Sequence, residues 1–152
     1  MHDVFEKTFI ATLVCTSDTL RGAVNVVPVG EIEGTGALGV REEGEGTALT
    51  FNYQGSPDGL PLFEITTGEP GAVLDIDING ALGLYPLDEE ISNKWQLQVL
   101  EQGDEQVPAR VQLKTEDGDA VLLDRSGGEG EETINVMDGE EVVFELRVVQ
   151  WL

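Results

Sequence analysis

The sequence predicts an all-β protein, a single-domain sandwich or barrel-like fold of short antiparallel strands with extended terminal segments. Roughly ten apolar, alternating runs are separated by turn signals rich in Gly, Asp, Asn and Pro, as in sandwiches and barrels. No stretch sustains the 3.6-residue period of an amphipathic helix, and residues 87–92 are the best place for one short helix. With 152 residues, of which 40% are hydrophobic, the chain is long enough for one core.

The C-terminal segment has the clearest strand pattern. Two β-prone runs, 133–137 and 140–152, are separated by an Asp-Gly pair at 138–139, which is typical of a two-residue type I′ hairpin turn. Alternate residues of the second run are large and apolar, and successive side chains of a strand point to opposite faces. The pattern therefore predicts a hairpin over 133–152, with Phe144 and Leu146 in the core.

The N-terminal segment is expected to be a strand if it pairs within the chain, or an extended arm if it does not. The apolar residues of one parity are Phe5, Phe9, Ala11, Leu13 and Cys15. We therefore divide the chain into an N-terminal strand or arm, residues 1–21, and a β domain, residues 22–152, that ends in the 133–152 hairpin. Residues 30–46 are rich in Gly and Glu and predict a flexible acidic loop or a poorly formed edge hairpin.

Charge and composition exclude several classes of partner. Thirty Asp and Glu residues against eight Lys and Arg give a net charge of −22, which repels nucleic acid and anionic membranes. No apolar run approaches the ~20 residues of a membrane helix, and no signal peptide is evident, so we expect a soluble protein made in the cytosol. The single cysteine, Cys15, rules out an intrachain disulfide and is expected to be a buried thiol.

One segment resembles a cation-binding loop. Asp75, Asp77 and Asn79, followed by Gly80, match the D-x-D-x-N-G start of an EF-hand calcium loop. That loop needs a bidentate glutamate at its twelfth position, which here is Pro86. We therefore expect a solvated strand face and turn, with no metal or other cofactor. If a cation does bind, these three residues are the first ligands to test.

No catalytic residue is predicted. The only histidine, His2, lies at the terminus, where it cannot hold the geometry of a nucleophilic site, and no serine falls within G-x-S-x-G. A zinc site lacks its histidine and cysteine ligands. Four aromatic residues could form a sugar-stacking platform: Trp95, Tyr53, Tyr85 and Trp151. Core packing is the better interpretation for Trp95, because this residue begins an alternating apolar strand face.

In overall character the chain resembles the capsid decoration, or cement, proteins of tailed bacteriophages. The features that carry the resemblance are a small acidic β domain, the segment 5–15, a glycine-rich acidic loop, and an apolar last strand ending Gln150-Trp151-Leu152. The resemblance implies a non-enzymatic structural protein of the virion, assembled in the host cytoplasm. It also implies a homotrimer that sits on the outer capsid surface and stabilises the shell by bridging neighbouring subunits of the major capsid protein.

Both ends of the chain are expected to contact partners. Segment 5–15 has only Glu6 and Lys7 as charges that would blunt a strand edge, and Val149 and Trp151 make the outer face of the last strand partly apolar. The expected partner-binding residues are Phe5, Phe9, Leu13, Trp151 and Leu152. The alternatives are a carbohydrate-binding or adhesin-like β-sandwich module, and a calcium-dependent β domain that uses Asp75 and Asp77.

Overall fold

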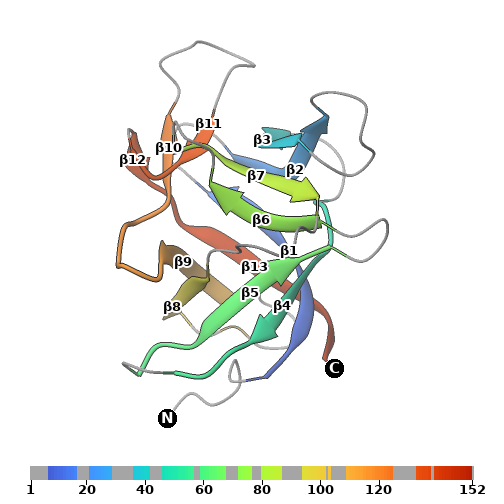
Figure 1. The fold of residues 1–152 in the computed structure, drawn as a ribbon, viewed down its shortest axis with the longest axis vertical. Coiled ribbons are helices and arrows are strands. Elements are labelled where there is room, and N and C mark those ends of the chain that lie inside the picture. The colour runs from blue at the N-terminus through green and yellow to red at the C-terminus, as the bar shows by residue number, and fades with distance from the viewer. Residues whose placement is uncertain are drawn as a thin grey trace.

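The computed structural model describes residues 7–16, 21–28, 36–41, 46–56, 59–67, 72–76, 80–86, 94–101, 103, 109–124, 133–137 and 139–151. These residues contain only strands and turns, which confirms the predicted all-β class (Figure 1). The strands are β1 (Phe9–Thr16), β2 (Arg21–Pro28), β3 (Gly36–Arg41), β4 (Leu49–Tyr53), β5 (Leu62–Thr66), β6 (Ala72–Ile76), β7 (Leu82–Pro86), β8 (Trp95–Glu101), β9 (Ala109–Thr115), β10 (Leu122–Asp124), β11 (Thr133–Asn135), β12 (Glu140–Glu141) and β13 (Phe144–Trp151). The predicted short helix at 87–92 lies outside the described residues.

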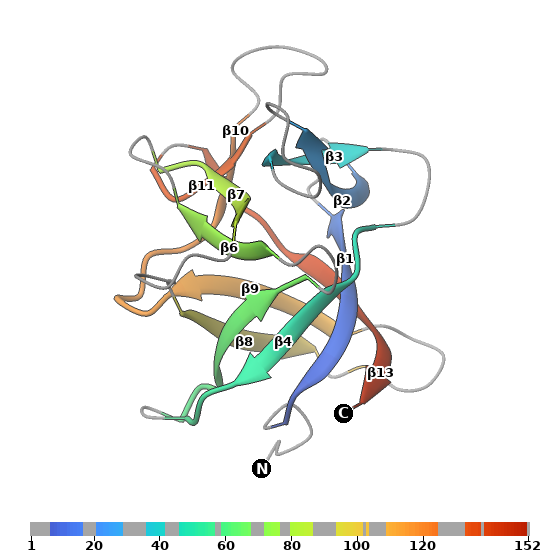
Figure 2. The same cartoon turned by 45° about the vertical axis from the view of Figure 1, so that its right-hand side comes forward.

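Six strands close into an antiparallel barrel. Their order is β1-β13-β9-β8-β5-β4, and β4 pairs back to β1. The barrel occupies the lower half of Figure 1, and Figure 2 shows β1 and β13 crossing it side by side. Of the two architectures that the sequence predicts, the structure has the barrel, which pairs most of its strands on both edges.

β1 is an interior strand of this barrel and does not form a detached arm. One edge pairs with β13, from Phe9 opposite Trp151 to Cys15 opposite Phe144. The other edge pairs first with β4 and then, from Val14 onwards, with β2. Because β1 pairs within its own chain, the strand alternative holds for the described part of residues 1–21.

Four further strands extend the sheet beyond the barrel. β2, β3, β7 and β6 follow one another from the end of β1, and β6 returns to the end of β5 at Thr66 opposite Val73. The indole Nε1 of Trp95, a fully buried barrel residue, donates a hydrogen bond of 3.2 Å to the Leu74 carbonyl oxygen of β6. The expectation of an edge hairpin within 30–46 is wrong for residues 36–41, because β3 has a neighbour on each side.

The predicted hairpin at residues 138–139 is also wrong. β11 and β12 do not pair with each other, because β10 lies between them in a separate three-stranded sheet. The residue before β12, Gly139, has a φ of 127°, and a Cβ there would collide with the Leu123 carbonyl oxygen of β10. The glycine therefore allows a close approach between neighbouring backbones. The run after the Asp-Gly pair is divided into β12 and β13.

A second Asp-Gly pair, at residues 117–118 between β9 and β10, forms the chain reversal that this dipeptide predicts. The Thr115 amide donates to the Asp119 carbonyl oxygen at 2.8 Å, and Gly118 takes a φ of 95°. After the bridge between Lys114 and Ala120, the chain leaves the barrel and enters the three-stranded sheet. The local turn signal therefore determined the reversal, whereas the partner of β10 depended on the rest of the fold.

The core follows the parity of the two terminal strands. Phe9, Ala11, Leu13 and Cys15 are at most 2% exposed, and so are Phe144 and Leu146. The rings of Phe9 and Phe51 stack at 4.9 Å between centroids, and Phe63 packs edge-on against both. The burial of these side chains confirms the predicted inward faces and the buried thiol.

We expect Leu146→Ala to lower the free energy of unfolding by ~2–5 kcal/mol, because it deletes a buried side chain and leaves a cavity in the barrel. Arg147→Ala, its exposed neighbour, should change stability by less than about 0.5 kcal/mol. Reversible denaturant titration measures both. A loss below about 1 kcal/mol for Leu146→Ala would contradict the assigned core.

Gly139→Ala should destabilise the protein more than Gly59→Ala. Both glycines have positive φ, so each substitution incurs the cost of a strained backbone, about 1 kcal/mol or more. Only at Gly139 does the added Cβ meet the backbone of β10, whereas nothing lies within 4 Å of a Cβ at Gly59. Equal losses in denaturant titrations would show that the approach of Gly139 to Leu123 does not constrain the fold.

Candidate functional site

The candidate site is the C-terminal half of β13, which continues beyond its pairing with β9. That pairing ends where Leu146 lies opposite Ala109, the first residue of β9. The preceding residue in the sequence is Pro108, which has no amide hydrogen for a strand ladder. From Arg147 to Trp151, the only described strand that pairs with β13 is β1. Within the described part of the chain, this half of β13 therefore has a neighbouring strand on one edge.

Exposed apolar side chains gather on the same half of β13. Val149 is 64% exposed and Trp151 is 44% exposed, and both are among the four exposed large apolar residues of the described chain. The register passes from Gln150 to Val148 across a β-bulge, so Val149 has no counterpart on β1. Bulges re-aim side chains, and here the extra residue points its apolar side chain into solvent. The other two exposed residues are Leu100 and Met137.

Trp151 is anchored against the aromatic end of the core. Its ring lies 5.2 Å from the ring of Phe9 and is inclined to it by 58°. The Lys7 ammonium nitrogen lies 5.6 Å from the centre of the indole, within the range of a cation–π contact. One side of Trp151 is therefore held in place while a large part of its surface remains in solvent.

The other expected partner-binding residues are placed differently. Phe9 is 0% exposed and Leu13 is 2% exposed, and both are covered by the chain's own barrel. The expectation that these two side chains bury against a second chain is corrected, because β4, β2 and β13 already flank β1. Phe5 and Leu152 lie outside the described residues. Trp151 is thus the described member of the set that is available at the surface.

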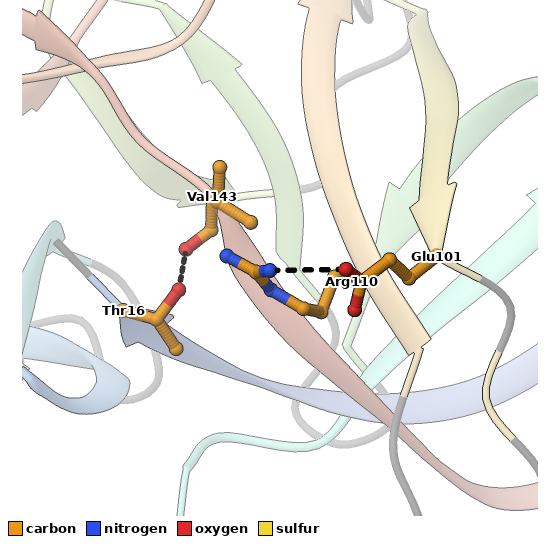
Figure 3. A network of polar contacts seen from close by, with 4 residues as sticks. All are labelled: Thr16, Glu101, Arg110 and Val143. Atoms are coloured by element: carbon orange, nitrogen blue, oxygen red, sulfur yellow. Dashed lines mark hydrogen bonds and ion pairs between the residues drawn. The ribbon is translucent and has the colours of Figure 1, made fainter.

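Two ion pairs lie on the outer face of β8, β9 and β13. Arg110 Nη1 is 3.4 Å from Glu101 Oε1, as Figure 3 shows, and Arg147 Nη2 is 3.7 Å from Glu145 Oε1. The Arg147 side chain is 59% exposed, whereas that of Glu145 is 15% exposed. Such pairs at the surface contribute little stability. The Arg147 side chain is therefore the more exposed member of its pair.

The start of β13 is fixed by a second contact in Figure 3. The Oγ1 hydroxyl of Thr16 donates to the Val143 carbonyl oxygen at 2.7 Å, as Figure 3 shows. The Thr16 amide donates to the same oxygen at 3.0 Å. This carbonyl belongs to the short link between β12 and β13. The contact ties that link to the last residue of β1, so the register of the two strands is set at the end far from Trp151.

Charge is distributed unevenly between the strands and the rest of the sequence. The strands contain five of the eight Lys and Arg residues but only seven of the thirty Asp and Glu residues. Their net charge is −2, and the segments outside them carry the remaining −20. From Leu146 to Trp151, β13 has no acidic residue. This stretch of β13 therefore has a net charge of +1 in a chain that is strongly acidic overall.

The described residues give no metal centre. No group of three or more His, Cys, Asp or Glu side chains in the described part of the chain could hold an ion. Asp75 lies on β6, where its Oδ1 accepts a hydrogen bond of 2.8 Å from the Ile76 amide. Asp77 and Asn79 lie outside the described residues.

The aromatic residues considered for a sugar platform do not form an exposed row. Trp95 is fully buried, as its alternating strand predicts, and Tyr53 and Tyr85 are half-buried. Tyr53 packs on Phe63 at 5.8 Å, and its hydroxyl pairs with that of Ser56. Of these four residues, only Trp151 is exposed.

No helical segment among the described residues has the length and apolar character needed to cross a bilayer. No protein family, curated protein or solved structure matches the chain.

We expect no micromolar calcium binding at Asp75, Asp77 and Asn79, because Pro86 stands where a calcium loop needs its bidentate glutamate. Titration calorimetry of the full chain should show no saturable heat, and Asp77→Ala should behave as the unsubstituted protein does. Micromolar binding that Asp77→Ala abolishes would contradict this and support the calcium-dependent alternative.

Proposed function

We propose that the protein is a non-enzymatic structural protein that decorates the outside of a viral shell and stabilises it by bridging neighbouring major capsid subunits. On this proposal the protein acts at the capsid surface of a virion. It is a homo-oligomer, and the resemblance to tailed-phage decoration proteins implies that the oligomer is a trimer. The observation that carries the proposal is the C-terminal half of β13, which has one described neighbour and carries exposed Val149 and Trp151.

The geometry of β13 supports attachment to another protein. Exposed aromatic residues are enriched where proteins contact one another, and the contacts on Phe9 and Lys7 already order the Trp151 ring. Many copies on one shell would make a modest contact effective, since each shell offers repeated sites.

The distribution of charge fits the same role. A net charge of −20 outside the strands keeps particles from adhering to one another or to nucleic acid. The end of β13 has no acidic residue and carries Arg147, so it is a region where another protein can approach with less repulsion. This distribution of charge favours binding through the end of β13 and disfavours binding through the rest of the surface. The lack of an exposed aromatic row among the residues considered leaves less support for sugar binding.

The test is retention of the purified chain on emptied tailed-phage shells, measured by co-sedimentation. We expect the unsubstituted protein to sediment with a shell that it recognises, and Val149→Asp with Trp151→Ala to reduce the bound fraction at least tenfold. The physical reason is that these changes remove the exposed apolar contacts and place an acidic residue on the edge of β13.

Met137→Asp is the matched control, because Met137 is 66% exposed, lies outside β13 and packs beside Gly80. It should bind as the unsubstituted protein does. Circular dichroism and denaturant titration of each variant confirm that it folds. Failure of every shell to retain the unsubstituted protein would overturn the proposal, as would equal retention of the β13 variant and the control.

A further inference from the structure

An exposed methionine packs where the three-stranded sheet meets the start of β7. Met137 follows β11 and is 66% exposed, so a small oxidant in solvent can reach it. We propose that Met137 is a site of oxidation by peroxide, and that its sulfoxide loosens the junction between β11 and the bend at Gly80. Attachment to a shell plays no part in this junction, because both segments belong to one chain.

The Met137 side chain lies directly over Gly80. A Cβ built at Gly80 would collide with Met137 Cγ and would lie 3.3 Å from its Sδ. Gly80 is buried and has a φ of 85°, a backbone conformation that residues with a Cβ rarely adopt. Position 80 therefore favours glycine for two reasons, and the methionine side chain fills the space that a Cβ would take.

Hydrogen bonds beside this contact join the same two segments. The Val136 amide donates to the Gly80 carbonyl oxygen at 2.9 Å, and Ala81 forms an isolated antiparallel bridge with Asn135. The Met137 amide donates to Asn135 Oδ1 at 2.8 Å, which orders the backbone that carries the thioether. The thioether therefore packs next to the hydrogen bond between Val136 and Gly80 and limits the access of water to it.

The oxidation needs hydrogen peroxide and no other reactant. The thioether sulfur attacks one peroxide oxygen, the O–O bond breaks, and the new S–O bond leaves the sulfur oxidised by two electrons. The departing hydroxide takes the proton of the transferred hydroxyl and leaves as water. The other sulfur that the structure describes belongs to Cys15, which is 0% exposed, and susceptibility to oxidation follows exposure. Among the described residues, Met137 is therefore the favoured site.

The sulfoxide changes the contact with Gly80. Oxidation converts a flexible apolar side chain into a polar one, so the modified side chain favours water over the surface of the glycine. Water then reaches the hydrogen bond between Val136 and Gly80, which lies outside the barrel. We expect local opening at this junction while the barrel remains folded.

The test treats the full-length protein with hydrogen peroxide and maps oxidised residues by mass spectrometry. Met137 should react at a rate within about threefold of that of a methionine in a short unstructured peptide, because exposure controls the reaction. Amide hydrogen exchange of the oxidised protein is then followed by NMR. The Val136 amide should exchange about fourfold faster, the change expected when one methylene group loses its cover. The Leu97 amide, which donates to the Pro61 carbonyl oxygen in the barrel, should be unchanged.

Met137→Leu is the matched control, because leucine keeps an apolar side chain over Gly80 and has no sulfur to oxidise. Its Val136 amide should not respond to peroxide. Met137→Gln places a polar side chain at the same position, and its Val136 amide should exchange at the faster rate without peroxide. Reduction of the oxidised protein by a methionine sulfoxide reductase should restore the slower exchange.

Three results would each overturn the proposed oxidation site. The first is a Met137 reaction rate below the stated range. The second is Val136 exchange that oxidation of Met137 leaves unchanged. The third is a peroxide response of the Val136 amide that persists in Met137→Leu, because the responding group would then lie elsewhere in the chain.

Discussion

Antiparallel pairing between β1 and β13 is the interaction on which the rest of the structure depends. It joins residues near the two ends of the described chain, from Phe9 opposite Trp151 to Cys15 opposite Phe144, and it closes the six-stranded barrel. β1 pairs with β13 on one edge and with β4 and β2 on the other. It is therefore a strand of the barrel, with its apolar face in the core, and not a detached arm. Contacts between residues so distant in sequence are costly in loop-closure entropy, so this fold is expected to form slowly.

The same pairing creates the candidate site. β13 follows β1 over its full length, whereas β9 begins only at Ala109, directly after a proline in the sequence. Among the described strands, the last residues of β13 therefore pair with β1 alone, and the bulge places Val149 in solvent. Trp151 is fixed by Phe9 on β1, which means that the adhesive surface and the core share a contact. A substitution in the aromatic core would thus affect the order of the exposed indole.

The strands and the segments outside them differ in net charge. The strands have a net charge of −2 and supply most of the core, while the other segments carry the remaining −20 of the net charge. Such a division limits the number of carboxylates next to the core, where their desolvation would be costly. It also leaves the end of β13 as a part of the surface where the sequence places no acidic side chain.

The sequence by itself determined the all-β class, the inward parity of the terminal strands, the buried thiol and the Asp-Gly reversal at residues 117–118, because alternation and turn chemistry are local properties. Tertiary structure decided that the barrel closes through β1, that β10 separates β11 from β12, and that Phe9 and Leu13 are core residues. Strand partners, unlike strand periods, are chosen by long-range packing, which no short stretch of sequence encodes.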